Sequence, residues 1–363
     1  MAPPPGNRAQ GRAGPGLMDR EEIRLRRLAG QRLIAPEDKL SAARSLCGVQ
    51  AQFMWNALHA LRIRCSGFDE GAAADGLVKN WTLRGTVHVF AESDLPLFIR
   101  AEDYRKNEWS ALNWWNSRPD WVLTPERQRY LSDVVLAALS EGARTREELK
   151  ETCRAEGMTP EEEQSMFHPW GGGVRQLCER GFMHYAASER KEFRLTPVFE
   201  PLPEGEAKLE LARRYFENYG PATIKDAAYF FGTTQAEVRR WLAALPVEAA
   251  ECGGRTYYYT ESGRHLDCGV PECIFLAGFD QLMLGYEKKE SLFLSPGYLR
   301  GIFNLAGIVL PAVLLRGQVA GRWKRRGRKL SIELFSQAGE RERAAMRESA
   351  ARLWGETTAV EFA

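Results

Sequence analysis

The sequence predicts an α+β protein with three tandem winged-helix modules and a C-terminal strand-rich, barrel-like domain. A chain of 363 residues is long enough for two or three compact modules. An outline of helices followed by a hairpin recurs three times before residue 265. After Cys273 the pattern changes to strands. Helix-turn-helix with a wing is a fold that most often docks on DNA.

The boundaries of the modules follow from these patterns. Residues 1–17 are rich in Pro, Gly and Arg and lack an apolar centre, so we expect a disordered tail and no secretory signal. The winged helices are expected at 18–120, 121–203 and 204–265, and the C-terminal domain at 266–363.

The first module is predicted from a helix that starts at Pro36. Apolar residues follow at helical spacing, and Gly48 is expected to end the helix. A second helix is expected from Met54 to Arg64. The segment from Trp81 to Phe90 alternates with a period of two and predicts a strand or hairpin.

The second module repeats this outline. A helix is expected at 125–140, and Thr145 with Glu148 forms a capping-box pattern that opens a short helix to Glu156. A further helix, interrupted by Gly171-Gly172-Gly173, is expected over roughly 166–180, and two short strands over 182–195 form the predicted wing.

The third module has the clearest pattern. Helices are expected at 206–218 and 222–231, and Thr233 or Thr234 is expected to cap a third helix. Two strands then pair around Gly253-Gly254, the glycine turn of a hairpin.

Composition narrows the possible functions. Apolar residues make up 44% and charged residues 27% of the chain, with a net charge of +2, so a basic surface must be sought locally. The seven cysteines are scattered and form no C-x-x-C pair, so we predict reduced thiols, no metal site and no cofactor. No apolar run approaches the roughly 20 residues that cross a membrane. A cytoplasmic location is expected.

Gln50 and Gln52 are the first candidates for catalysis. If the helix ends near Gly48 and the next residues are extended, both amides project to one side, and Val49 and Ala51 to the other. A glutamine amide can both donate to a water and accept from it. The alternative is a pair of glutamines on a helix surface.

Arg84, Thr86 and His88 form a second candidate group. Arg84 precedes a glycine and could hold a phosphate or a carboxylate. A lone histidine on a strand is more often structural than catalytic, so a structural role for His88 stays open.

A basic block forms the third candidate. Seven like charges without an acid would attract a phosphate backbone, although surface solvation is the usual role of such a run. The cations are Arg316, Arg322, Lys324, Arg325, Arg326, Arg328 and Lys329, and Trp323 lies among them. Walker, G-x-G-x-x-G, H-E-x-x-H and G-x-S-x-G motifs are all missing, which disfavours nucleotide hydrolysis, dehydrogenase and serine-hydrolase chemistry.

Several segments in order resemble a known family. The segment 48–52, Gly-Val-Gln-Ala-Gln, and the segment 81–88, Trp-Thr-Leu-Arg-Gly-Thr-Val-His, are similar to the winged-helix DNA glycosylases of the AlkZ and YcaQ type. The segments 277–286, 301–304 and 313–323 also resemble that family. The likeness extends from about Met18 to the C-terminus.

The resemblance implies tandem winged helices that scaffold a concave, basic surface for double-stranded DNA. It implies hydrolysis of the N-glycosidic bond of N7-alkylated purines, in some members within interstrand crosslinks. The family's Gln-x-Gln motif maps onto Gln50 and Gln52. One branch carries Asp at the second position, so this chain looks closer to the crosslink-resistance branch. The family's DNA-probing hairpin maps near residues 316–326.

Two rival functions remain open. A non-catalytic DNA-binding protein, such as a transcription regulator, would retain a specific fragment and release no base. Regulators usually dimerise to contact paired half-sites, whereas we expect a bacterial, nucleoid-associated monomer. A small-molecule-binding protein that shields the cell from a DNA-damaging compound would bind that compound without DNA.

Overall fold

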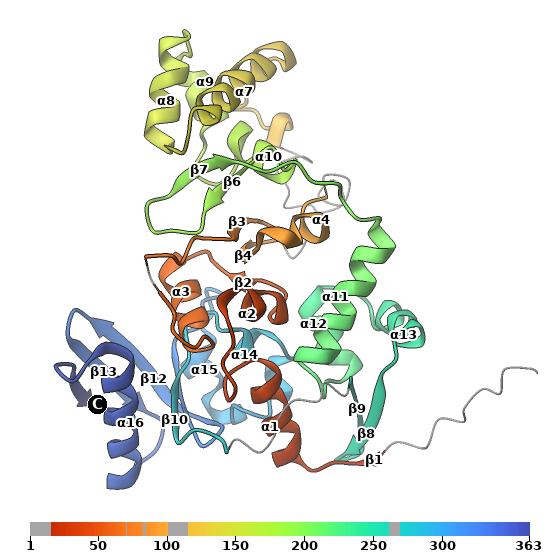
Figure 1. The fold of residues 1–363 in the computed structure, drawn as a ribbon, viewed down its shortest axis with the longest axis vertical. Coiled ribbons are helices and arrows are strands. Elements are labelled where there is room, and N and C mark those ends of the chain that lie inside the picture. The colour runs from red at the N-terminus through yellow and green to blue at the C-terminus, as the bar shows by residue number, and fades with distance from the viewer. Residues whose placement is uncertain (1–15, 70, 83–84, 101–114, 261–268) are drawn as a thin grey trace, which may run out of the picture.

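The computed structural model describes residues 16–69, 71–82, 85–100, 115–260 and 269–363. The described elements combine helices with three β-sheets, which confirms the α+β class. Figure 1 shows an elongated molecule, with one group of helices at one end of the long axis and the C-terminal sheet near the other. Within the described ranges no helix is long and apolar enough to span a membrane.

The first unit contains the two glutamines. Its elements are β1 Gly16–Leu17, α1 Arg20–Gly30, α2 Lys39–Ser45, β2 Val49–Gln50, α3 Met54–Arg62, β3 Leu77–Trp81, β4 Val87–Ala91 and α4 Leu95–Phe98. Asp38 caps α2, because its side chain accepts from the backbone N–H groups of Leu40 and Ser41 at 2.9 and 3.0 Å. Gly48 adopts φ 80° after α2, so the predicted stop before the glutamines is confirmed.

The predicted tail and hairpin of this unit can be compared with the structure. Most of the predicted tail, residues 1–15, lies outside the described residues. Gly16 and Leu17 are ordered as β1 and pair in parallel with strand β8 of the third unit, so the tail prediction is wrong for these two. The predicted hairpin is confirmed as the antiparallel pair β3 and β4.

The second unit follows at the far end of the long axis. Its elements are α7 Pro125–Ser140, β5 Arg144–Thr145, α8 Arg146–Ala155, α9 Pro160–Met166, α10 Gly172–Glu179, β6 Met183–Ala186 and β7 Glu192–Leu195. The capping box of Thr145 and Glu148 is confirmed. The predicted interruption at Gly171-Gly172-Gly173 is confirmed: α9 ends at Met166 and α10 begins at Gly172, so the helix proper covers only the later part of 166–180. Gly172 has φ 73°, and a side chain there would meet the backbone of residue 165.

The third unit matches its prediction closely. Its elements are α11 Glu204–Asn218, α12 Ile224–Phe231, α13 Gln235–Ala244, β8 Glu248–Cys252 and β9 Arg255–Tyr259. Thr234 caps α13, since its side chain accepts from the N–H of Glu237. The strands β8 and β9 pair in antiparallel fashion around Gly253 and Gly254.

The C-terminal unit is a sheet with one long helix. Its elements are β10 Cys273–Phe275, α14 Gln281–Leu284, α15 Leu299–Ile302, β11 Ala312–Leu315, β12 Gln318–Arg326, β13 Lys329–Leu334, α16 Glu340–Trp354 and β14 Ala359–Phe362. The strands follow one another from β10 to β14, so β10 and β14 are the two edges. The strand-rich prediction is therefore confirmed as an open sheet and not as a barrel-like form, and α16 packs against β10. Short 3-10 turns occur at Glu92–Asp94, Trp115–Ser117, Lys288–Glu290 and Pro296–Tyr298.

One strand arrangement recurs in the first three units. In the first, β2 pairs with β4, and in the second, β5 pairs with β7. In the third, Ala222 makes an isolated bridge to Tyr258 in β9. Each unit therefore places a segment between two helices beside the last strand of its hairpin. The first two units also join edge to edge through β3 and β6, which produces a six-stranded sheet.

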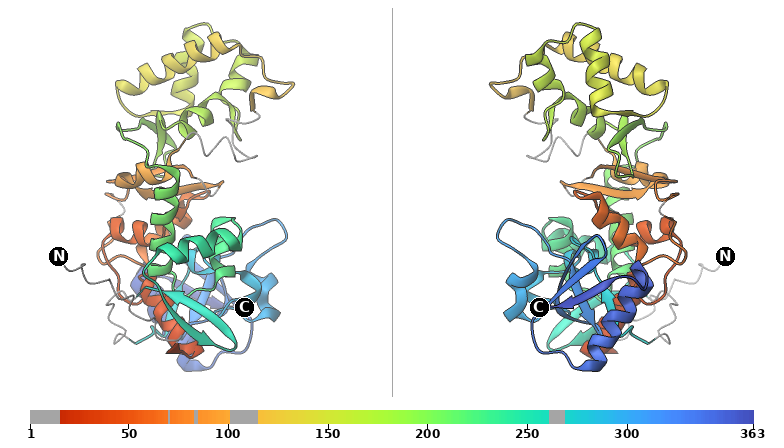
Figure 2. Two further views of the ribbon diagram at one scale, coloured as in Figure 1. Left: turned by 90° about the vertical axis from the view of Figure 1, so that its right-hand side faces the viewer. Right: turned by 90° about the vertical axis from the view of Figure 1, so that its left-hand side faces the viewer.

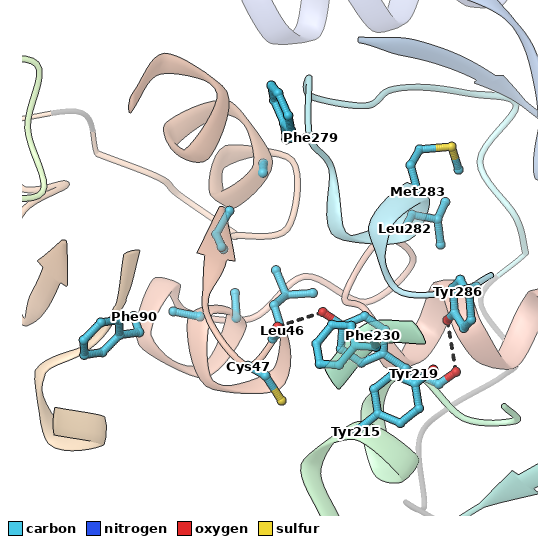
Figure 3. Close-up of a cluster of buried hydrophobic side chains, with 14 of the residues drawn as sticks. Leu46, Cys47, Phe90, Tyr215, Tyr219, Phe230, Phe279, Leu282, Met283 and Tyr286 are labelled. Carbon is cyan, nitrogen blue, oxygen red and sulfur yellow. Dashed lines mark hydrogen bonds between the residues drawn. The ribbon is translucent and has the colours of Figure 1, made fainter. Parts of the chain in front are cut away.

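The first unit, the third unit and the start of the C-terminal unit share one apolar core. Figure 3 shows its centre, where Tyr219 donates to the backbone oxygen of Leu46 at 2.7 Å and Tyr286 donates to that of Tyr219 at 3.0 Å. The second unit has a separate core. In Figure 2 its helices form a distinct group above β3 and β4.

Two ion pairs are buried within this shared body. Arg64 contacts Asp280 at 2.7 Å with both side chains fully buried. Arg27 contacts Asp226 at 3.1 Å and also donates to the backbone oxygen of Pro221. A buried guanidinium needs such a partner, because burial without one is costly. These pairs connect α3 to the start of α14, and α1 to α12.

Candidate active site

The segment that carries the glutamines is extended. Val49 pairs with Val89 and Gln50 with His88 across β2 and β4, and the N–H of Ala51 donates to the oxygen of Val87 at 2.8 Å. The helix-surface alternative for the glutamines is therefore wrong. Hydrogen bonding to β4 fixes the face that each side chain occupies.

Burial alternates along this segment as the extended prediction requires. Val49 is 1% exposed and Ala51 is 0% exposed, so both lie in the core. Gln50 is half-buried and Gln52 is exposed. Gln50 therefore lies on the face of the sheet opposite to that of Val49, beside His88, and solvent reaches Gln52 in the bend that follows.

The β3–β4 hairpin flanks this segment within one sheet, and residues directly opposite in antiparallel strands share a face of that sheet. His88 is 1% exposed and lies opposite Gln50 in the strand register. Its Nδ1 lies 3.0 Å from the Thr82 hydroxyl and 3.0 Å from the Thr86 carbonyl oxygen. A ring that is buried to this extent cannot contact a DNA phosphate. His88 and the Thr86 backbone oxygen instead make contacts within the β3–β4 hairpin. Arg84 lies outside the described residues.

Two exposed aromatic side chains follow the glutamines, which sequence reasoning missed. Phe53 is 43% exposed, and its ring stacks 6.0 Å from that of Phe279. Trp55, in the first turn of α3, is 49% exposed. Exposed apolar side chains that gather in one patch mark binding surfaces, and Phe53 and Trp55 lie two residues apart, directly after Gln52. Sequence alternation alone gives no signal for their exposure, because both positions also fit a helix start.

A groove of about 850 Å³ begins at Trp55 and runs along α3. We call it the α3 groove. One wall is the α3 face that carries Trp55, Leu58, His59 and Arg62, and the other comes from β12 and β13. Glu189, in the turn between β6 and β7, closes a third side. Figure 1 shows α3, this turn and the β12–β13 hairpin on the same side of the molecule.

Aromatic rings form the floor of the α3 groove. His59 stacks on Trp354 at 5.6 Å and meets Trp323 edge-on at 5.1 Å. Burial lowers the pKa of His59 to about 4, so the ring is neutral near pH 7. Trp323 is only 6% exposed and donates its indole N–H to the Leu276 oxygen at 2.8 Å. Trp323 thus belongs to this aromatic floor, which corrects the expectation that it contacts DNA from the surface.

The basic block is more neutral than its sequence suggests. Arg316 pairs with Glu342 at 2.5 Å, and Arg322 forms a two-pronged contact with Glu333 at 2.7–2.9 Å. Lys329 pairs with Glu361. The block itself contains no acid, as the sequence shows, but other strands and α16 supply carboxylates to these three cations.

Four cations of the block remain exposed at the β12–β13 turn. They are Lys324, Arg325, Arg326 and Arg328. No ion pair to a carboxylate joins any of the four within the described residues. The structure therefore concentrates the basic character of the block at the tip of this hairpin.

A metal centre has no support in the described part of the chain. No group of three or more His, Cys, Asp or Glu side chains comes together there. The cysteines in the described ranges are free thiols.

The comparisons with known proteins decide the family. The profile of the AlkZ-like DNA glycosylase family matches residues 43–355. The chain belongs to this family. It is thus a DNA glycosylase, an enzyme that hydrolyses an N-glycosidic bond.

Two relatives agree with this assignment. The chain is 28% identical over 316 residues to an interstrand DNA cross-link repair glycosylase of Streptomyces sahachiroi. The aligned region covers 80% of the chain and 83% of that protein. The solved structure of the S. sahachiroi DNA glycosylase AlkZ superposes with a TM-score of 0.72 at 22% identity, over 96% of the chain and 100% of AlkZ. The glycosylase described here therefore has the AlkZ fold.

Proposed function

We propose that this DNA glycosylase hydrolyses the N-glycosidic bond of N7-alkylated purines, with Gln50 and Gln52 positioning the attacking water. The observation that carries the proposal is the alternation of burial over residues 49–52. Val49 and Ala51 are buried, whereas the neutral amides Gln50 and Gln52 are half-buried and exposed. A glutamine carbonyl accepts from a water, and its NH₂ group donates.

The chemistry suits a neutral pair. Alkylation at N7 makes the purine cationic, so the C1′–N9 bond breaks without protonation of the leaving base, and the base departs neutral. Water then forms the new C1′–O bond and its proton passes to solvent. Gln50 and Gln52 hold the water near C1′, and this positioning lowers the entropic part of the barrier. An ordinary uncharged base would need a general acid, which an amide cannot supply.

The same proposal includes the tandem winged helices and the DNA contact. The recurrence of one strand arrangement in three helix-and-hairpin units supports winged-helix modules, which dock on DNA in many proteins. We assign backbone phosphates to the exposed cations Lys324, Arg325 and Arg326. Arg316 and Arg322 are weaker candidates, because carboxylates already neutralise them.

A crosslinked purine is the second part of the proposed substrate range. The S. sahachiroi relative is described as an interstrand DNA cross-link repair glycosylase. In this chain the second motif position is Gln52, as in the crosslink-resistance branch that the sequence resembles. A crosslinked base cannot easily rotate into a tight pocket, and Gln52 stands exposed on an open face. We propose that the enzyme acts on these substrates in duplex DNA, as a monomer in the cytoplasm.

Base release from defined duplexes tests the proposal. We expect the chain to release 7-methylguanine from methylated duplex DNA and to leave an abasic site, with no release of uracil from a matched duplex. An N7-linked crosslinked duplex should become denaturable after incubation. Release of uracil at the rate of 7-methylguanine would refute selection for a cationic leaving group. Retention of one promoter fragment as a dimer, without base release, would favour the transcription-regulator alternative.

A further inference from the structure

The α3 groove is a cavity whose aromatic rings take no part in the proposed base release, although its rim shares Lys324 and Arg325 with the proposed phosphate contacts. Trp55, Leu58, His59 and Arg62 recur at helical spacing, so one face of α3 lines it. The opposite wall belongs to the C-terminal unit, more than two hundred residues later in the chain. Its volume of about 850 Å³ lies within the range of small-molecule sites.

The surfaces of the α3 groove are suited to a flat ring. His59 and Trp323 are only 8% and 6% exposed and pack against Trp354, so the half-buried Trp354 is the ring of the floor that a ligand can contact. Trp55 stands half-exposed at the mouth. Aromatic rings offer large contact areas to a planar partner at low cost in side-chain entropy.

The charges at the rim favour a negative group on that ring. Arg322 is neutralised by Glu333, but Lys324 and Arg325 have no carboxylate partner in the described residues. The guanidinium carbon of Arg325 lies 5.6 Å from the centre of the Trp354 ring. The acids in the lining are Glu189 and Glu333, against the cations Arg62, Arg322, Lys324 and Arg325. Two cations beside an aromatic floor are complementary to a ligand with a flat apolar body and an anionic end.

We propose that the α3 groove binds a planar aromatic small molecule that carries an anionic group, and that it does so without DNA. This activity goes beyond the glycosylase reaction and does not depend on it. It gives the chain a second mode of action, in which a free compound is held by the C-terminal unit and α3.

Two probes with one ring system and opposite charge test the proposal. The full chain is titrated with 9-anthracenecarboxylate and, separately, with 9-(aminomethyl)anthracene, by calorimetry without DNA. We expect saturable binding of one carboxylate probe per chain and about tenfold weaker binding of the ammonium probe. No binding of the carboxylate, or equal binding of both probes, would overturn the proposal.

Matched variants locate the site. Trp55→Ala should weaken carboxylate binding by about tenfold. Trp170→Ala removes an equally large side chain that is 70% exposed in the second unit, outside the groove, and should change nothing. The double variant Lys324→Glu and Arg325→Glu should reverse the preference between the probes. Equal losses in Trp55→Ala and Trp170→Ala would refute the assignment. Because the assay contains no DNA, its failure leaves the proposed glycosylase reaction unaffected.

Discussion

Breaking the buried pair of Arg64 and Asp280 should strongly destabilise the body that holds α3. The guanidinium makes two contacts to the carboxylate, at 3.0 and 2.7 Å. It also donates to the backbone oxygens of Gln31 and Ala60, each at 2.9 Å. Asp280 in turn accepts from the N–H of Leu282 and caps α14. The pair thereby fixes the C-terminal end of α3, the helix that lines the groove.

The magnitudes follow from what each substitution leaves behind. Asp280→Asn strands a buried guanidinium and should cost about 3–5 kcal/mol in the free energy of unfolding. The asparagine oxygen can still accept from Leu282. Arg64→Met strands a buried carboxylate and also two backbone oxygens, so it should cost about 1–2 kcal/mol more. The double variant should cost less than the sum, because no uncompensated charge remains.

Urea unfolding followed by circular dichroism at pH 7 measures these costs. The control is Arg352→Met in the surface pair with Glu348, whose side chains are 62% and 72% exposed, and it should cost less than about 0.5 kcal/mol. Single-variant costs close to that of the control would refute the reasoning. Strict additivity in the double variant would do so as well, because it would mean that the two charges do not interact.

Three further predictions concern β2, the basic hairpin and pH. Gly48→Ala should destabilise the chain by about 1 kcal/mol or more in thermal unfolding and slow base release, because φ 80° disfavours any side chain. Lys324→Ala and Arg325→Ala should each lower the slope of log Kd against log salt by about 1 in fluorescence anisotropy with duplex DNA, and the already paired Arg322 should matter less. Burial lowers the pKa of His59 from 6.5 to about 4, so the unfolded chain binds its proton first. Stability should therefore fall by about 3 kcal/mol as pH falls from 6.5 to 4, and His59→Gln should remove that part of the slope.

Local signals allowed much of the fold to be predicted. The stop at Gly48, the capping box of Thr145 and the glycine turn of β8 and β9 each depend on a few adjacent residues, and all are found in the structure. The extended segment at Gln50 follows from one of these signals, because ending α2 leaves the next residues free to pair with β4.

The features that could not be predicted from the sequence depend on contacts between residues far apart in the chain. The carboxylate of Glu342 that neutralises Arg316 comes from α16. The walls of the α3 groove come from units far apart in the chain, and no periodicity within either wall indicates that they meet. The open form of the C-terminal sheet likewise depends on which strands become edges, a property of pairing and not of any single strand.

Single-turnover release of 7-methylguanine from a methylated duplex tests the catalytic role of the glutamines most directly. Wild type is compared with Gln50→Ala, Gln52→Ala and, as a surface control, Gln235→Ala on the exposed face of α13. Loss of either water-positioning amide should slow release by about 100-fold or more with the fold intact, and the control should match wild type. Wild-type rates of release in both Gln50→Ala and Gln52→Ala, with each variant folded, would contradict the account.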